Sequence, residues 1–304
     1  FYTFQTMSYV IDVYRRHVQP THRFVDFALY VAFFPQLVAG PIERADRLLP
    51  QIQQPRRIRI ADLEEGAYLF LWGLFEKIVV ADTLAPLVES VFGGPPPYAG
   101  PAVLVALYAF AFQIFCDFDG YSNMARGVAR WMGVDLMVNF RLPYFATDPR
   151  DFWRRWHVSL STWLRDYLYI PLGGNQQGRW MTYRNLLLTM LLGGLWHGAA
   201  WTCGGWGLYH GLLLAGHRLW KERVGWSKRS ETSGGNLWLV FRIVACFHAV
   251  CLGWLFFRAA SLDQVFGLLR ALFVGTSSTD FGGYALALMV FVAAPFMVLE
   301  WFIY

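Results

Sequence analysis

The stretch LLLTMLLGGLWHGAAW, residues 186–201, decides the fold that we predict for this chain. It is apolar over most of the ~20 residues that a membrane-spanning helix requires, yet it carries one titratable side chain, His197. An ionisable residue inside a membrane segment indicates function, although a lone histidine also serves as a hydrogen-bond donor to a neighbouring helix. The stretch therefore predicts a span with a candidate site at His197, and both roles stay open at this point.

The neighbours of His197 are either very small or aromatic. The small ones are Gly193, Gly194, Gly198, Ala199 and Ala200. Their lack of side-chain volume lets another backbone or a substrate approach closely, and Trp196 and Trp201 add rigid aromatic walls that we predict to line a substrate site. A neutral imidazole in such a dry pocket can accept a proton near physiological pH.

The composition indicates a membrane protein throughout. Of the 304 residues, 56% are hydrophobic and only 15% are charged, whereas soluble domains carry about 25% charged residues. We predict an all-α, polytopic bundle of about six to eight spans, forming one membrane-embedded domain over residues 1–304. The chain opens at Phe1 without an initiator Met or a signal peptide, so we expect a fragment whose N-terminal spans are missing.

The charged residues and the cysteines argue against a nucleic-acid-binding protein and against a metal or redox site. The net charge of +5 comes from basic loops, which mark the cytoplasmic side of a membrane protein rather than a nucleic-acid surface. The four cysteines show no CxxC spacing and no adjacent histidine cluster, so we expect no metal site and no redox site.

Apolar runs and proline positions place the spans. The predicted spans besides 186–201 are 63–91, 101–118, 206–220, 237–257 and 284–304. The run Phe24 to Gly40 contains Pro35 and precedes Pro41, which predicts a broken, re-entrant segment. By the positive-inside rule, we expect the basic loops 43–62 and 218–229 to lie in the cytoplasm.

Residues 148–168 predict an amphipathic helix at the membrane interface. Asp148 and Pro149 form a favourable helix start. At helical spacing, aromatic residues form one stripe and polar residues another face. The polar face consists of Arg154, His157, Ser161 and Arg165. It suits either anchoring to lipid phosphates or a substrate site, and the spacing alone does not separate the two.

Four motifs resemble one family when they are taken together. They are FFPQLVAGPIER (33–44), DFWRRWHVSLSTWLRDYLYIPLGG (151–174), GGLWHGAAW (193–201) and GWLFFRA (253–259). They resemble the membrane-bound O-acyltransferase (MBOAT) family, and in particular its bacterial polysaccharide O-acetylation branch, typified by the membrane subunit of alginate O-acetylation.

The resemblance implies a polytopic helical enzyme that transfers an acyl group from a thioester to a hydroxyl. His197 matches the family's histidine in an apolar helix, and His157 matches its second, upstream polar residue. We expect His197 to be the base and His157 to orient the donor or to hydrogen-bond the carbonyl oxygen. Arg154 and Arg165 would hold the phosphates of a coenzyme A carrier, with Ser161 beside them.

The resemblance also implies partners and a direction of transfer. The chain would take acetyl from a cytoplasmic donor such as acetyl-CoA and, with no bound cofactor, pass it across the membrane. A periplasmic acetyltransferase subunit would then complete O-acetylation of an exported polysaccharide such as alginate. Two alternatives stay open: the D-alanyl transfer subunit of teichoic acid modification, and a lipid or acyl transporter without chemistry.

Overall fold

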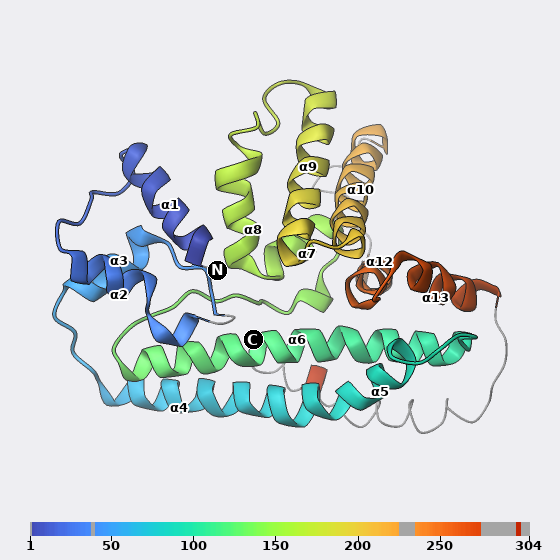
Figure 1. Ribbon diagram of the computed structural model, residues 1–304, viewed down its shortest axis with the longest axis horizontal. Coiled ribbons are helices and arrows are strands. Elements are labelled where there is room, and N and C mark those ends of the chain that lie inside the picture. The colour runs from blue at the N-terminus through green and yellow to red at the C-terminus, as the bar shows by residue number, and fades with distance from the viewer. Residues whose placement is uncertain (1, 38–39, 225–234, 275–295, 299–304) are drawn as a thin grey trace. The chain divides into compact units, whose positions relative to one another are not determined.

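The computed structural model describes residues 2–37, 40–224, 235–274 and 296–298. All regular elements within these ranges are helical, which confirms the predicted all-α class (Figure 1). In chain order they are α1 (Tyr2–Tyr14), α2 (Phe24–Val31), η1 (Phe34–Gln36), α3 (Ala45–Gln53), α4 (Ile60–Phe75), η2 (Glu76–Ala81), α5 (Asp82–Phe92), α6 (Gly100–Trp131), η3 (Pro143–Phe145), α7 (Pro149–Arg155), α8 (Val158–Leu164), η4 (Arg165–Tyr169), α9 (Arg179–His197), α10 (Trp201–Val224), α12 (Gly235–Arg258) and α13 (Leu262–Val274).

Two helices in the described part of the chain are long and apolar enough to cross a membrane, namely α6 and α12. They contain the predicted spans 101–118 and 237–257. The predicted span 63–91 is helical, but the π-helical turn η2 interrupts it between α4 and α5. The predicted span 284–304 lies almost entirely outside the described residues.

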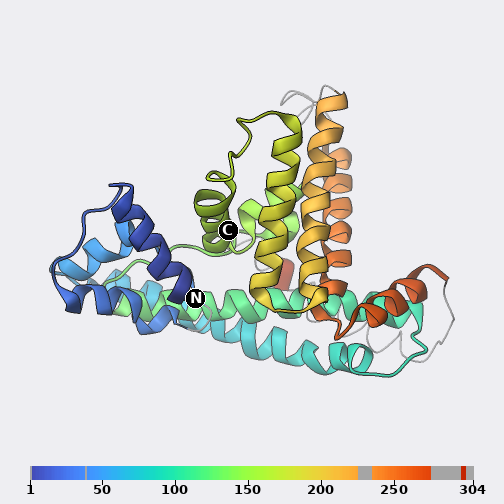
Figure 2. The ribbon, with the colours of Figure 1, turned by 45° about the horizontal axis from the view of Figure 1, so that its top comes forward.

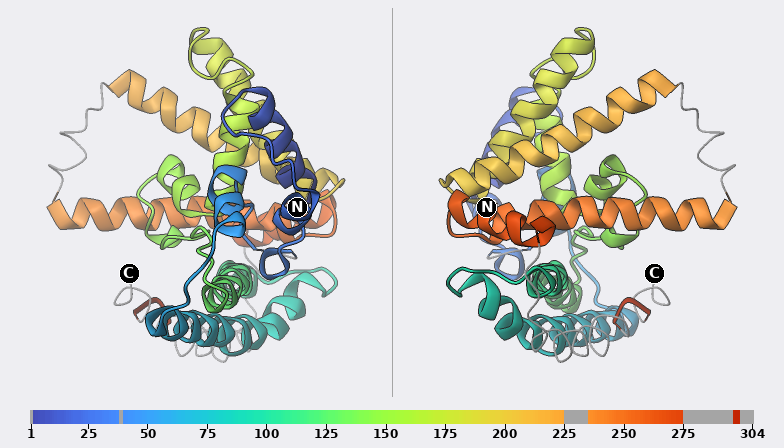
Figure 3. Two further views of the ribbon diagram at one scale, coloured as in Figure 1. Left: turned by 90° about the vertical axis from the view of Figure 1, so that its left-hand side faces the viewer. Right: turned by 90° about the vertical axis from the view of Figure 1, so that its right-hand side faces the viewer.

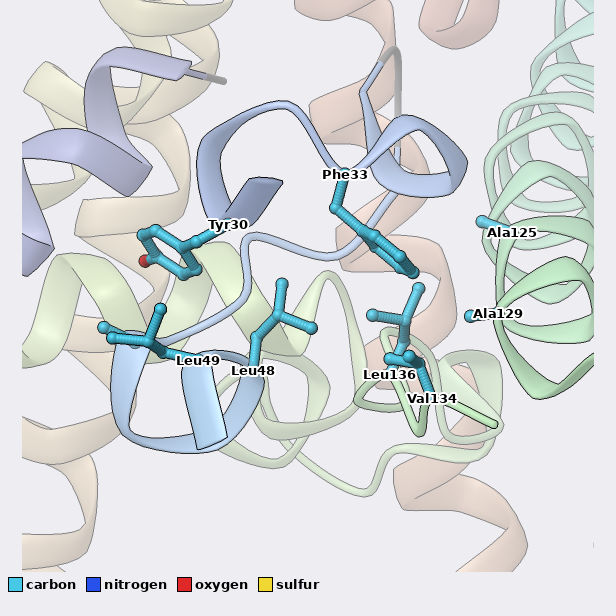
Figure 4. Close-up of a cluster of buried hydrophobic side chains, with 9 residues drawn as sticks. Tyr30, Phe33, Leu48, Leu49, Ala125, Ala129, Val134 and Leu136 are labelled. Atoms are coloured by element: carbon cyan, nitrogen blue, oxygen red, sulfur yellow. The ribbon is translucent and has the colours of Figure 1, made fainter. Parts of the chain in front are cut away.

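The chain forms two compact units. The first comprises Phe1–Asp82, Ile114–Arg141 and His157–Trp163, and the second comprises Thr83–Gln113, Leu142–Trp156 and Leu164–Tyr304. In the first unit, apolar side chains of α2, α3 and the C-terminal part of α6 share a buried core (Figure 4). Its labelled members include Tyr30, Phe33, Leu48 and Leu136, and Phe33 reaches toward Leu136.

Glycines allow α4 to lie directly along the C-terminal half of α6 (Figure 2). A Cβ atom on Gly120 would lie 2.7 Å from the carbonyl oxygen of Gly73, and one on Gly127 would lie 2.6 Å from that of Gly66. Real Cβ atoms do not approach backbone this closely, so the four positions tolerate no larger residue without moving the helices. Close packing of small residues is how helices associate in lipid, where the hydrophobic effect gives little help.

The second unit is built around the antiparallel pair α9 and α10 (Figure 2). Here too the backbones approach closely, since a Cβ on Gly194 would lie 2.9 Å from Cα of Gly207. A Cβ on Gly211 of α10 would lie 3.3 Å from Cα of Leu187 of α9. Gly194, one of the small residues of the stretch quoted first, therefore serves helix packing.

The predicted break in the apolar run 24–40 is confirmed. The helix α2 ends at Val31, and the 3₁₀ turn η1, which contains Pro35, follows it.

A buried carboxyl, that of Glu43, follows this broken run. The Glu43 side chain is fully buried; the backbone N–H of Met137 donates to it, and the Arg47 guanidinium lies 4.0 Å away. Burial raises the pKa of Glu43 to about 7, because the distant guanidinium does not offset the loss of water.

We expect Gly120→Leu to lower the melting temperature of the detergent-solubilised protein, because the new side chain must push α4 away from α6. The cost of such overpacking is about 1–3 kcal/mol. Gly216→Ala is the matched control, because a Cβ there meets open space. Equal melting temperatures for Gly120→Leu and the control would contradict the packing described above.

The Glu43 carboxyl predicts a pH-dependent stability. Its folded pKa of about 7 lies above the ordinary value of 4.5, so the folded state holds the proton between these values. Stability from this group is therefore greatest at low pH and falls as pH rises toward 7. Glu43→Gln should stabilise the protein at pH 8 by on the order of 1–3 kcal/mol and have little effect at pH 5. A thermal-unfolding difference that does not change with pH would refute this.

Candidate functional site

The predicted helix over 148–168 is not continuous. The helix α7 ends at Arg155, α8 begins at Val158, and His157 between them has a φ of +43°. This left-handed conformation is uncommon for a residue other than glycine and clusters at functional sites. The prediction of one amphipathic helix is therefore wrong.

Asn139 gives the physical reason for this break. The N–H of Val158 donates to the Asn139 carbonyl oxygen at 2.8 Å, and the N–H of Ser159 donates to Asn139 Oδ1 at 3.3 Å. The first amides of α8 are thus bound by a distant segment instead of by the last turn of α7. Hydrophobic periodicity carries no information about such a tertiary partner.

The same asparagine holds the His157 ring. Asn139 Oδ1 lies 3.1 Å from His157 Nδ1 and also accepts the Ser159 hydroxyl at 2.9 Å, while Nδ2 donates to Ser122 Oγ at 3.3 Å. Because Nδ2 faces Ser122, the oxygen faces the imidazole, and it can only accept. This network places a ring proton on Nδ1, where the Asn139 oxygen accepts it.

His157 is buried among aromatic rings in the first unit. It is 3% exposed, and Phe118 contacts it edge-on at 4.6 Å between ring centroids. The imidazole therefore combines a fixed tautomer with an environment from which water is largely excluded. Sequence reasoning identified His157 but missed Asn139, because a position 18 residues upstream has no recognisable spacing to it.

The other residues of the predicted polar face do not share one helix. Arg154 is an exposed residue of α7. Ser161 lies in α8, where its N–H donates to the His157 carbonyl oxygen at 2.9 Å. Arg165 begins the π-helical turn η4, and its guanidinium binds the neighbouring Asp166 carboxylate with an Nε to Oδ1 distance of 2.7 Å. Their roles in donor binding stay predictions.

His197 is the last residue of α9. The predicted span 186–201 is wrong in its bounds, because Gly198 adopts an extended conformation and α10 begins at Trp201. The stretch thus forms the end of one helix, a three-residue connection and the start of the next. Apolar length alone does not reveal this tight reversal.

Aromatic rings surround the half-buried His197 side chain. Trp196, Trp206 and Phe257 contact the imidazole with ring-centroid distances of 4.9, 5.2 and 5.4 Å. No described residue hydrogen-bonds this imidazole, so the structure gives no support to a purely hydrogen-bonding role. Trp201, predicted as a second wall, is 84% exposed at the start of α10.

A second histidine that sequence reasoning missed lies close to His197. Trp206 contacts both imidazoles, since its ring centroid is 5.2 Å from that of His197 and 5.1 Å from that of His210. His210 is fully buried, and its Nε2 has no hydrogen-bond partner among the described residues. The available signal was its place inside the predicted span 206–220, where an ionisable residue is a candidate for function.

Three indoles around His210 are equally unsatisfied. The Nε1–H groups of Trp153, Trp206 and Trp254 are buried without a partner in the described ranges. Their rings contact His210 with centroid distances of 5.2, 5.1 and 6.3 Å. Buried donors are normally paired, so this aromatic cluster holds unused hydrogen-bonding capacity beside His197.

Comparison with known proteins gives a family match for most of the chain. Residues 13–257 match the sequence model of the membrane-bound O-acyltransferase family. The chain is 45% identical over 273 residues to the probable alginate O-acetylase of Pseudomonas aeruginosa, covering 90% of this chain and 50% of that protein. It is 36% identical over 299 residues to the peptidoglycan O-acetyltransferase of Helicobacter pylori, covering 90% and 55%.

A more distant relative has a different acyl group in its name. The teichoic acid D-alanyltransferase of Bacillus subtilis is 30% identical over 248 residues, which cover 78% of this chain and 61% of that protein. The chain thus spans about half the length of the alginate and peptidoglycan relatives given above. The family match covers most of the chain, including the two motifs that contain His157 and His197. This chain belongs to the membrane-bound O-acyltransferase family.

Proposed function

We propose that this O-acyltransferase moves an acetyl group from a cytoplasmic thioester donor, acetyl-CoA, toward the hydroxyls of an exported polysaccharide such as alginate. The observation that carries the proposal is the His197 imidazole at the end of α9, packed against aromatic rings beside unsatisfied indole N–H groups. The names of the alginate and peptidoglycan relatives support acetyl as the acyl group.

The His197 imidazole is suited to remove the proton of an acceptor hydroxyl. The hydroxyl oxygen then attacks the thioester carbonyl carbon and gives a tetrahedral oxyanion. As this collapses, the carbon–sulfur bond breaks, and the imidazolium returns its proton to the leaving thiolate. Buried N–H donors that have no partner among the described residues, such as that of Trp206, are suited to stabilise such an oxyanion, and the Trp206 ring contacts His197 directly.

His157 acts through a fixed tautomer in this proposal. In the neutral ring with its proton on Nδ1, the lone pair is on Nε2, and there it would accept a hydrogen bond from the acceptor hydroxyl. Arg154, Arg165 and Ser161 remain the proposed contacts for the donor, and Trp196 and Trp201 those for the acyl group. We further propose that the protein lies in the bacterial inner membrane and passes acetyl to a periplasmic acetyltransferase subunit.

The D-alanyl relative supports a second candidate function. A protein named for D-alanyl transfer to teichoic acid matches 78% of this chain, so a carrier-bound D-alanyl donor is the alternative to acetyl-CoA. Incubating the purified protein with each donor separates the two, because only one should give His197-dependent release of the free carrier thiol.

We expect His197→Ala to lower polymer O-acetylation by about 10²–10⁴-fold, the usual contribution of a general base. The level of the protein in the membrane should not change, because the imidazole lies at the end of a helix and holds no other helix by a hydrogen bond from a described residue. Mass spectrometry of the O-acetyl content of the exported polymer measures the effect. The control is His22→Ala, which removes an exposed imidazole. Wild-type acetylation in His197→Ala would disprove the role of base.

Asn139 variants test the tautomer. Asn139→Leu removes the acceptor and should lower kcat by about 10²-fold, since the ring proton is no longer held on Nδ1. Asn139→Asp keeps an acceptor but adds negative charge, which favours imidazolium. It should retain more activity and move the acid limb of the pH–rate profile upward by about one pH unit. A purely structural role for Asn139 predicts lower activity with an unmoved profile.

A further inference from the structure

Tyr108 and His248 form a hydrogen-bonded pair within the second unit. Tyr108 lies in α6 and His248 lies in α12, and the phenol oxygen Oη is 2.7 Å from His248 Nε2. Figure 3 shows α12 lying across α6, which is seen nearly end-on in both views. Neither residue belongs to the candidate sites at His157 and His197.

A backbone carbonyl fixes the direction of this hydrogen bond. His248 Nδ1 lies 2.7 Å from the carbonyl oxygen of Val244, one turn earlier in α12. Because a carbonyl oxygen can only accept, Nδ1 carries a proton. In the neutral ring the lone pair is then on Nε2, and the Tyr108 hydroxyl donates its proton to it. The imidazole is therefore already the acceptor of the phenol proton.

The three groups have the arrangement of an activated nucleophile. Covalent catalysis typically uses an oxygen or sulfur nucleophile, a base within hydrogen-bonding distance, and a third group that orients the base. Tyr108 Oη, His248 Nε2 and the Val244 carbonyl supply these parts, with both hydrogen bonds at 2.7 Å. A hydrogen bond that only joins two helices does not require an oriented imidazole.

The Tyr108–His248 pair is accessible from outside the described part of the chain. His248 is exposed, and Tyr108 is half-buried. His248 also lies within α12, which is long and apolar enough to cross a membrane. Ionisable residues in such helices usually face the interior of a helix bundle or a water-filled cavity, and they indicate function. The exposed imidazole is thus placed where a polar substrate can reach it.

We propose that Tyr108 is a nucleophile that accepts an acetyl group, with His248 as its base. The inference rests on the proposed function for its donor, acetyl-CoA. The phenol oxygen attacks the thioester carbonyl carbon while its proton passes to His248 Nε2. The carbon–sulfur bond then breaks, and the imidazolium returns the proton to the leaving thiolate. The products are O-acetyl-tyrosine at position 108 and the free thiol.

An acetyl ester of a phenol keeps its acetyl group reactive. A phenol and a thiol have ordinary pKa values of about 10 and about 8.5, so the two are similar leaving groups. Transfer from a thioester to Tyr108 consequently costs little of the reactivity of the acetyl group. The ester can pass the group on to a sugar hydroxyl, so Tyr108 is suited to hold acetyl between a donor and an acceptor.

The test uses the full chain, purified in detergent, with para-nitrophenyl acetate and, in parallel, acetyl-CoA as acetyl donors. After digestion, mass spectrometry quantifies acetyl on each tyrosine, and neutral hydroxylamine identifies the linkage because it cleaves phenol esters but not amides. We expect Tyr108 to be labelled at least about 10²-fold faster than Tyr14, since a general base contributes that much. Tyr14 is the internal comparison because it is 87% exposed.

Three variants separate the base from a structural hydrogen bond. His248→Gln keeps an acceptor for the phenol but cannot take up its proton, so it should slow labelling of Tyr108 by about 10²–10⁴-fold with little change in melting temperature. Tyr108→Phe should remove the label while keeping the ring that contacts Phe247 at 5.6 Å. Tyr183→Phe is the matched control, because this hydroxyl donates to the Glu222 carboxylate at 3.0 Å.

The two donors distinguish failure of this inference from failure of the proposed function. Equal labelling of Tyr108 and Tyr14, or a wild-type labelling rate in His248→Gln, would overturn the role of the pair. Labelling of Tyr108 by the nitrophenyl ester alone would uphold the nucleophile and reject acetyl-CoA as its donor. His197-dependent release of the coenzyme A thiol without label on Tyr108 from either donor would uphold the proposed function and reject the nucleophile.

Discussion

The hydrogen bonds of Asn139 are the constraint on which the first candidate site depends. One side chain and its own carbonyl bind the first amides of α8 and the imidazole of His157. If these amides were instead bonded within one continuous helix, residue 157 would have ordinary helical angles and its ring would point elsewhere. The left-handed conformation of His157 costs on the order of 1–3 kcal/mol, and the network around Asn139 offsets it.

Close contact between glycines governs the rest of the architecture. Two glycines of α4 face two of α6 in the first unit, and Gly194 faces Gly207 in the second. In a membrane, the hydrophobic effect contributes little to the association of helices. Close packing of one helix backbone against another therefore stabilises the association. The same small residues fix α9 against α10 and so hold His197 beside Trp206.

Sequence reasoning predicted the helical class, the family and the spans within α6 and α12. The helical class and the spans follow from composition and from long apolar runs, and the family follows from the resemblance of four motifs; all of these are local properties of the sequence. It was wrong to predict one continuous helix over 148–168, because Asn139, distant in sequence, binds the first amides of α8. It was also wrong about the end of α9, because the chain turns tightly after His197. Asn139 escaped notice because it becomes meaningful only through residues that the fold brings near it, whereas His210 lies in the predicted span 206–220 and could have been found by the rule applied to His197.

The position of His197 at the very end of α9 has an electrostatic consequence. The peptide dipoles of a helix add up to a partial negative charge at its C-terminus, where the final carbonyl groups have no partner within the helix. An imidazole that has just accepted a proton becomes a cation beside this negative end. The backbone of α9 itself thus favours the charged intermediate of a proton transfer.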